Sequence, residues 1–404
     1  MLAPQRTRLI APALKVMAGI AVVCVLYLVA WPVEIDPTAW TPPRAPSPTG
    51  VFAPNDRLTH LEKVAERDIG PESVAIDARG YLYTGLLDGR IVRIEPDAAT
   101  VGPYAQAREP LGMEFDVDGN LIVADASLGL ISVDPGGNIA TLTREVDGTP
   151  INFADDLAIA SDGTIYFTDA STKFTNRESV SDIFEHRPNG RLLAYTPSTG
   201  LTRVVLDGLY FPNGAAIGPN EAYLLFNETS MYRVRRYWLT GERAGQTDTF
   251  IDNLPGFPDN ISFNGHDTFW VALAGGPRLR AALDPLLPHP FLRKIVWRIP
   301  GFLSGTSTGE GYVVGLDLHG NVVHTLQDPS GETYPDTTSV IEHMGWLYIG
   351  SFSAHGVGRV RVPESRGGGT VPERGLLASS SSNNIMANAP ASDAVRRDAW
   401  SRRR

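Results

Sequence analysis

The chain has a single cysteine, Cys24, among its 404 residues. An intramolecular disulfide is therefore impossible, and the fold must be stabilised by packing. Because Cys24 stands within an apolar run, it reads as a small hydrophobic residue. The globular part of the chain also has no cluster of Lys and Arg, and the formal net charge is −10. Nucleic-acid binding needs such a cluster to displace counterions, so we do not expect a nucleic-acid partner.

One familiar catalytic signature is missing as well. The sequence has no HExxH, and its eight histidines show no metal-ligand spacing, which excludes a zinc-peptidase motif. The letters GxSxG occur at residues 305–309, in a long gap between repeats and not directly after a β-rich run, so they do not predict a serine nucleophile elbow. No long segment outside the N-terminus has a helical period of 3.6 residues, which argues against a parallel α/β fold.

The longest hydrophobic run lies at the N-terminus. It extends from Val16 to Val33 without a charge and follows several basic residues. A run of about 20 apolar residues can cross a bilayer, and the basic flank predicts a cytoplasmic N-terminus with the rest of the chain on the extracytoplasmic side. A cleaved signal peptide is the alternative, although its apolar core is usually shorter and a small-x-small site should follow. We predict a cytoplasmic stub and a transmembrane helix over residues 1–36.

Two segments of biased composition flank the central region at residues 56–363. Residues 37–55 are rich in Pro, which predicts a semi-rigid spacer that lifts the following domain off the membrane. Residues 364–404 are rich in Gly and Ser and end in several arginines. Their low content of apolar residues predicts a disordered tail.

One pattern recurs six times in the central region. Each copy has a turn rich in Asp, Gly, Asn or Pro, then two β-rich runs of aliphatic and aromatic residues separated by a gap. The copies begin at Gly80, Gly119, Gly163, Glu221, Asp267 and Gly345. Repeats of this length, with four short strands each, are typical of propeller blades. We therefore predict an all-β fold, a six-bladed β-propeller.

A propeller must also close into a ring. We expect the run Leu58–Val64 to supply the outer strand of the blade whose other strands lie near residues 346–362. The long gaps at residues 171–190 and 275–310 predict loop insertions over one face of the propeller.

Polar residues recur just ahead of the expected innermost strands. They are Glu72 in GPES, Asp155 and Asp156 in FADDLA, Asn213 in FPNG, and Asp259 and Asn260 in FPDN. Innermost strands all line the central channel, so these side chains can converge at one point. Oxygen ligands without Cys or His favour a hard cation such as Ca²⁺ or Mg²⁺, and converging carboxylates would repel one another without it. Each residue alone is more often a turn former; their recurrence at matching positions favours a site.

These motifs resemble those of the strictosidine synthase-like proteins, especially the adipocyte plasma membrane-associated protein group. More broadly, they are similar to the gluconolactonase, senescence-marker-protein and paraoxonase superfamily. The resemblance covers residues 56–363 and implies a six-bladed propeller with one N-terminal membrane span. In the metal-dependent members the matching positions bind Ca²⁺, which implies Glu72, Asn213 and Asp259 as ligands here. Asn260 matches the second residue of the paraoxonase Asp-Asn pair.

The sequence departs from this family pattern at three places. Asp155-Asp156 stands where the family usually has Asn-Asp, which adds a negative charge at a position that can still bind a cation. The paraoxonase-type histidine, expected near Leu111–Gly112, is missing. Only Glu310 and Glu342 could stand for the catalytic glutamate of true strictosidine synthases, and both match poorly, so we do not expect the strictosidine condensation.

The leading hypothesis is a metal-dependent hydrolase that acts on a small-molecule lactone or related ester. A divalent cation, Ca²⁺ or another, would polarise the substrate carbonyl, and Asp259, or else Asp155 or Asp156, would act as the catalytic base. The expected cation ligands are Glu72, Asp155, Asn213, Asp259 and Asn260. The alternative is a membrane-tethered propeller that binds a partner and whose metal is structural, because the fold does not settle the function.

Overall fold

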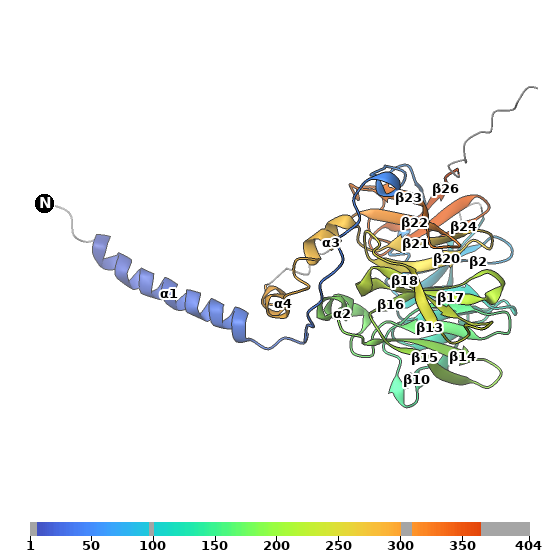
Figure 1. The fold of residues 1–404 in the computed structure, drawn as a ribbon, viewed down its shortest axis with the longest axis horizontal. Coiled ribbons are helices and arrows are strands. Elements are labelled where there is room, and N and C mark those ends of the chain that lie inside the picture. Colours follow the sequence, from blue (N-terminus) through green and yellow to red (C-terminus); the bar gives the residue numbers. More distant parts are fainter. Residues whose placement is uncertain (1–5, 97–100, 300–308, 365–404) are drawn as a thin grey trace, which may run out of the picture. The chain divides into compact units, whose positions relative to one another are not determined.

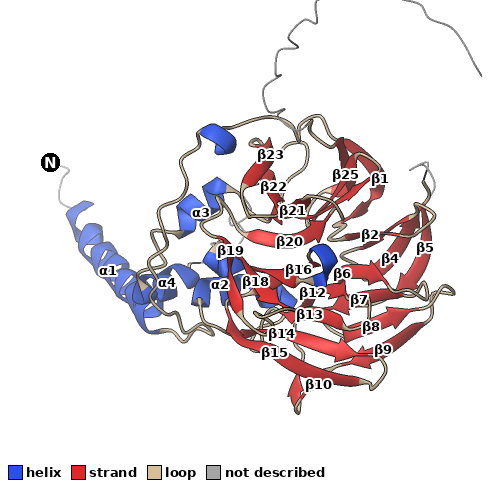
Figure 2. Cartoon of the chain, turned by 45° about the vertical axis from the view of Figure 1, so that its right-hand side comes forward, coloured by secondary structure: helices blue, strands red, loops and turns tan. Residues whose placement is uncertain are grey.

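The computed structural model describes residues 6–96, 101–299 and 309–364. Apart from its first residue, the tail predicted to be disordered lies outside these ranges. The described strands form six four-stranded antiparallel sheets and one small two-stranded sheet. The first strand of each large sheet contacts the first strands of neighbouring sheets, so these strands surround a central axis. The chain is a six-bladed β-propeller, as its repeats predict (Figures 1 and 2).

The first three blades, each given from its innermost to its outermost strand, follow in chain order. Blade 1 has β2 (Val74–Ile76), β3 (Leu82–Gly85), β4 (Arg90–Ile94) and β5 (Val101–Gln106). Blade 2 has β6 (Pro110–Phe115), β7 (Leu121–Asp125), β8 (Gly129–Val133) and β9 (Ile139–Thr143). Blade 3 has β12 (Ala154–Ile159), β13 (Ile165–Asp169), β14 (Gly190–Thr196) and β15 (Leu201–Leu209). The small sheet pairs β10 (Glu145–Val146) with β11 (Thr149–Pro150).

The other three blades complete the ring. Blade 4 has β16 (Pro212–Ile217), β17 (Tyr223–Glu228), β18 (Arg233–Trp238) and β19 (Thr247–Ile251). Blade 5 has β20 (Pro258–Phe263), β21 (Thr268–Leu273), β22 (Gly311–Asp317) and β23 (Val322–Asp328). Blade 6 has β24 (Thr337–His343), β25 (Trp346–Ser351), β26 (His355–Arg361) and β1 (Glu62–Ile69). The six repeats seen in the sequence are the second and third strands of the six blades.

Blade 6 joins the two ends of the propeller. Its outer strand β1 pairs antiparallel with β26, with Val64 opposite Val357. The predicted closure is therefore confirmed, although the strand begins at Glu62 instead of Leu58. Pairing β1 with β26 joins the start of the propeller to its last blade and so closes the ring.

The hydrophobic core lies between neighbouring blades. Leu225 of blade 4 packs with Val271 and Leu316 of blade 5, and all three are fully buried. Ile122 of blade 2 meets Phe167 of blade 3 in the same way. Because both faces of a blade are covered by its neighbours, the strands carry apolar residues at most positions rather than at every second one.

The two long gaps form insertions that contain short helices. The first holds the 3-10 turn η2 (Asn176–Glu178) and α2 (Ser179–Glu185), and the second holds α3 (Pro277–Leu283) and α4 (Pro290–Trp297). Three further 3-10 turns are η1 (Gly50–Phe52), η3 (Pro219–Glu221) and η4 (Thr229–Met231). Helices α2, α3 and α4 gather on one side of the propeller (Figure 2).

The N-terminal helix α1 extends over Arg6–Ala30 and includes most of the hydrophobic run. Within the described part of the chain, no helix meets the length and hydropathy needed to cross a membrane. The predicted transmembrane span is therefore not confirmed.

Residues 37–55, which their composition predicts to be a semi-rigid spacer, lie against the propeller. Trp40 stacks on His186 with 4.3 Å between ring centroids, and Arg280 donates a hydrogen bond to the Pro43 carbonyl at 2.7 Å. The segment keeps the extended form that Pro favours, but its carbonyls are bound along the propeller by buried side chains. Composition predicts a stiff segment and does not say what holds it.

Candidate metal centre

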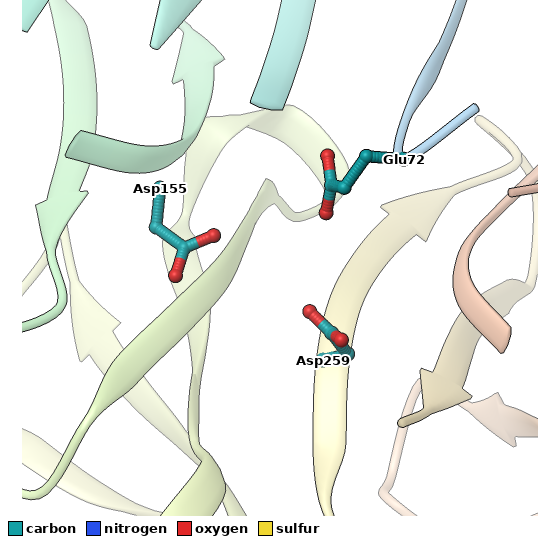
Figure 3. A group of neighbouring side chains, drawn as sticks. All are labelled: Glu72, Asp155 and Asp259. Carbon is teal, nitrogen blue, oxygen red and sulfur yellow. The ribbon is translucent and has the colours of Figure 1, made fainter. Parts of the chain in front are cut away.

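Four of the predicted ligands lie at the starts of innermost strands and converge on the axis. Glu72 lies two residues before the start of β2, Asp155 lies in β12, Asn213 in β16 and Asp259 in β20. All four are buried. The carboxylates of Glu72, Asp155 and Asp259 each offer an oxygen within 4.8 Å of the other two. Figure 3 shows the three side chains pointing toward one another from different blades.

The start of each ligand-bearing strand is irregular in register. The pairing of β12 with β13 shifts between Ala154 and Leu157. The same shift occurs between β16 and β17 and between β20 and β21, just past the proline that opens each inner strand. Such bulges redirect side chains and are common beside functional sites. They explain how strand residues near the axis can aim oxygens along it.

Two glycines allow the inner strands to approach closely. A Cβ added to Gly214 would lie 2.4 Å from the Ile261 backbone nitrogen and 2.6 Å from the Asp259 carbonyl oxygen. A Cβ on Gly112 would lie 2.2 Å from the Asp156 carboxylate. Any side chain at either position would push neighbouring inner strands apart. The glycine after Asn213 in FPNG is thus required by the distance between β16 and β20.

Side chains from adjacent strands hold the ligand backbones in place. In each case a hydroxyl or amide donates a hydrogen bond to the carbonyl oxygen of a predicted ligand. The pairs are Thr168 with Asn213 at 2.7 Å, Thr338 with Glu72 at 2.6 Å, and Asn227 with Asp259. The ligand set is therefore positioned before any ion binds, which is how second-shell groups usually act.

Burial and mutual repulsion disfavour the charged forms of the three acids. Burial raises the pKa of Glu72 well above its ordinary value, and the charges of Asp259 and Asp156 raise it further. The pKa of Asp155 is also raised well above its ordinary value, by burial first and then by Asp259 and Glu72. Burial likewise raises the pKa of Asp259, and the neighbouring Asn213 amide offsets this in part. A bound cation would reverse these shifts by supplying the missing positive charge.

Several buried oxygens of the predicted ligands lack a hydrogen-bond partner among the residues that the structure describes, and this bears on whether a cation fits the site. Glu72 Oε2, Asn213 Oδ1 and Asp259 Oδ1 are buried and have no hydrogen-bond partner within the described structure. Buried oxygens without partners are rare because each one costs the free energy of its lost hydration. Glu72 and Asp259 belong to the converging set of acids, and Asn213 lines the same cavity as they do. A set of oxygen donors only fits a hard cation such as Ca²⁺.

A cavity of about 380 Å³ opens directly beside these acids. Leu111, Phe153, Phe211 and Phe257 line it from the propeller, and α2 and α3 add an outer wall of Val180, Ile183, Leu279 and Leu283. No Lys, Arg or His is found among the described residues that line it. The cavity is thus apolar around most of its wall and acidic at its inner end.

Asp156 and Asn260 do not face this cavity. Both line a second cavity of about 240 Å³ further along the innermost strands. The Asp156 carboxylate accepts a hydrogen bond from the Ala215 N–H at 2.9 Å, and burial raises its pKa to about 7. Asn260 donates from Nδ2 to Glu72 Oε1 at 2.8 Å. The structure therefore separates Asp156 from the proposed reaction site and gives Asn260 a contact that orients Glu72.

One acid of the first cavity was missed in the sequence. Asp336 lines the cavity, accepts a hydrogen bond from the Ser353 hydroxyl at 2.7 Å and has a left-handed backbone with φ 47°. The segment Tyr334-Pro335-Asp336 repeats the aromatic-Pro-Asn/Asp pattern of FPN and FPD ahead of the sixth inner strand. This recurring pattern could have identified Asp336 from the sequence.

Three residues stand where related proteins have, or could have, a catalytic residue: Leu111, Glu310 and Glu342. Leu111, at the place expected for the paraoxonase-type histidine, is buried and lines the first cavity. Glu342 accepts a hydrogen bond from Trp270 Nε1 at 2.7 Å, and Glu310 pairs with Arg278 at 3.4 Å. Neither of these two glutamates is among the residues that line the first cavity.

Comparison with known proteins places the chain in a family. The strictosidine synthase family model matches residues 155–242, and the strictosidine synthase-like N-terminal model matches residues 50–94. The adipocyte plasma membrane-associated protein of Bos taurus is 33% identical over 83% of this chain and 86% of its own. The chain belongs to this strictosidine synthase-like family. Strictosidine synthase-like 6 of Arabidopsis thaliana is also 33% identical, over 70% of this chain and 76% of its own.

Solved structures support the fold. A gluconolactonase from Xanthomonas campestris superposes with a TM-score of 0.55 at 17% identity and covers 83% of this chain and 99% of its own. A calcium-binding protein, regucalcin, from Agrobacterium tumefaciens has a TM-score of 0.51 at 14% identity, over 74% of this chain and 90% of its own. At these identities the similarity establishes a shared propeller and no shared activity.

Proposed function

We propose that the chain is a metal-dependent hydrolase of a lactone or related ester with a substantial apolar part. The observation that carries this proposal is the pairing of an apolar cavity with three converging acids at its inner end. An apolar wall binds the alkyl or aryl part of a substrate, and the polar end receives the reactive group. The gluconolactonase and the calcium-binding regucalcin among the structural neighbours are consistent with this reading.

Glu72, Asp155, Asn213 and Asp259 would hold the cation, with Ca²⁺ favoured by the all-oxygen donor set. When bound, such an ion acts as a Lewis acid toward a substrate carbonyl. Asn260 keeps Glu72 oriented through its amide. Phe211 and Phe257 line the cavity and would keep water away from the reacting group.

Asp259 is the carboxylate that we assign to proton removal from the attacking water. It lines the cavity, and its Oδ1 accepts no hydrogen bond from the described residues. Burial raises its pKa in the metal-free chain, and a bound cation would lower it again, so the assignment rests on the position of this carboxylate in the cavity. Asp156 was another candidate for the catalytic base. It lines the second cavity and would not contact the substrate in this proposal.

The test is hydrolysis by the full chain, supplied with Ca²⁺, Mg²⁺, Mn²⁺ or Zn²⁺, of a panel of lactones and aryl esters of increasing chain length. We expect activity that requires a cation and grows with the apolar part of the substrate. Glu72→Gln should abolish it, whereas Glu114→Gln, a change at a channel acid outside the first cavity, should not. A chain that binds the cation tightly but cleaves no member of the panel would contradict the proposal and favour the binding module.

We also infer that the chain associates with a membrane through α1, with its N-terminus cytoplasmic. The uncharged run supports this, as does the name of the plasma membrane-associated relatives. Extraction of the full chain from cell membranes with alkaline carbonate provides the test. We expect the wild type to stay with the membranes, Val22→Lys/Val25→Lys to be released, and Val117→Lys to behave as wild type. Release of the wild type would contradict it.

A further inference from the structure

Helix α4 exposes apolar side chains and buries a charged one, the reverse of the usual pattern for a surface helix. Phe291 and Leu292 are exposed by 60% and 39%, and Ile299, just past the helix, by 44%. The charged side chain of Arg293 is fully buried instead. A surface helix normally turns its apolar stripe inward and its charges outward. Here the outward face of α4 is apolar.

The buried arginine explains why the apolar side faces out. Arg293 donates hydrogen bonds to the carbonyls of Phe184, Thr38 and Leu287. These acceptors belong to α2, the N-terminal segment and the turn before α4. Because a buried guanidinium needs such partners, they fix the rotation of the helix. The exposed face of α4 is thus held in place by its inward contacts.

The same surface continues onto α1. Arg298, at the end of α4, donates to the Leu28 carbonyl at 2.9 Å and to the Trp31 carbonyl at 2.6 Å. Both carbonyls lie at the C-terminal end of α1, where a helix leaves acceptors unpaired. The apolar side chains of α1, such as Leu26 and Val29, are exposed as well. The exposed apolar residues of α4 therefore lie beside the end of a helix that is itself apolar on its surface.

From this juxtaposition we propose that the outward face of α4, formed by Phe291, Leu292 and Ile299, rests in the interfacial layer of a lipid bilayer. A bilayer is the occupant that covers both the whole length of α1, about 37 Å at 1.5 Å per residue, and a short helix fixed at its end. Aromatic residues near that end, Tyr27 and Trp31, are of the type that gathers at the membrane interface. A short helix with apolar residues outward binds in the plane of such an interface.

The contact also bears on the first cavity. Helix α3, in the same insertion as α4, supplies Leu279 and Leu283 to the cavity wall, and Val296 and Trp297 of α4 pack in the same cluster as Leu283. Helix α4, which would contact lipid, is thus packed against α3, which forms part of the wall of the first cavity. An apolar substrate dissolved in the bilayer would have a short route to the cavity, and this consequence alone depends on the proposed hydrolase activity.

The test uses the full chain and its single cysteine. In a Cys24→Ser background, a cysteine replaces Leu292 or, as the matched control, Val117, which is 92% exposed in a turn of the propeller. Each is labelled with a polarity-sensitive fluorophore, and the protein is placed in phosphatidylcholine vesicles. We expect the label at 292 to be quenched severalfold more by lipid-borne nitroxide than the label at 117, and severalfold less by iodide in the water.

Adding Phe291→Asp should restore iodide access to the label at 292, whereas Val117→Asp should not. Equal iodide quenching at both positions, with no quenching by lipid nitroxide, would overturn the proposal. Protection from iodide without lipid quenching would overturn it too, because it would identify a second protein copy as the occupant.

Discussion

Asp155 and Asp156 are neighbours in the chain, yet they lie in different cavities of the channel. In the first cavity, Glu72 Oε2 and Asp259 Oδ1 are buried and accept no hydrogen bond from the described residues. In the second, Asp156 is bonded by the N–H of Ala215, and Glu114 by that of Ile159 at 3.1 Å. These N–H groups offset burial only in part, since the pKa of Asp156 and that of Glu114 are still raised to about 7. The unpaired oxygens of the first cavity have no such donor, and that is where we propose the cation.

The largest expected effect separates the two cavities directly. Asp259→Asn should reduce cation-dependent kcat/KM by about 100-fold or more, because it removes a ligand charge and the base together. Asp156→Asn should change it much less. Calorimetric titration with Ca²⁺ and steady-state hydrolysis measure the two variants side by side. If Asp156→Asn were the more damaging change, the assignment of the reaction to the first cavity would be wrong.

Cation removal should make stability depend on pH. The pKa values of Glu72, Asp155 and Asp259 are raised in the folded chain. Their stabilising contribution is thus fully present below about pH 4 and is lost as the pH rises through the folded values. We expect the metal-free chain to have a smaller free energy of unfolding at about pH 8 than at about pH 5.

Saturation of the site should then recover the loss. At about 100 times its Kd, the cation adds about 2.7 kcal/mol to the free energy of unfolding. Urea titrations at both pH values, with Ca²⁺ and with chelator, provide the measurement. A metal-free chain whose stability is unchanged over this range would show that the three acids are compensated by something other than a cation.

Asp155→Asn tests the departure from the family pattern. It removes one of three buried negative charges but keeps an oxygen ligand. We expect the cation Kd to rise about tenfold, equal to about 1.4 kcal/mol, and the metal-free chain to become more stable at pH 8. Asp156→Asn is again the comparison, with a weaker effect on Kd. Unchanged affinity in Asp155→Asn would exclude Asp155 from the ligand set.

The smallest expected effect concerns Asp336, the other acid of the first cavity. Loss of a general base costs about 100-fold or more. If Asp259 has that role, Asp336→Asn should lower kcat by much less and leave the cation Kd unchanged. Hydrolysis rates across the pH range distinguish the two acids, since a large loss in kcat without weaker cation binding would transfer the role to Asp336.

Much of the fold could be predicted because the middle strands of each blade carry their own signals. Hairpin turns such as that around Gly80 and alternating apolar runs are local features. The outer strands, for example β15 and β19, lack a continuous apolar pattern because only one of their edges is paired and much of their surface is exposed. The short helices of the insertions have too few residues to show a period of their own.

The sequence by itself determined the number of blades and the recurrence of polar residues ahead of the innermost strands, because turns and strand periods depend on near neighbours in the chain. Only the tertiary structure decided which oxygens meet. Successive residues of a strand point in opposite directions and bulges shift that alternation, so Asp155 and Asp156 could be assigned to their cavities only once the six inner strands were packed around one axis. The outward turn of α4 has the same origin, because the partners of Arg293 come from segments that are distant in the sequence.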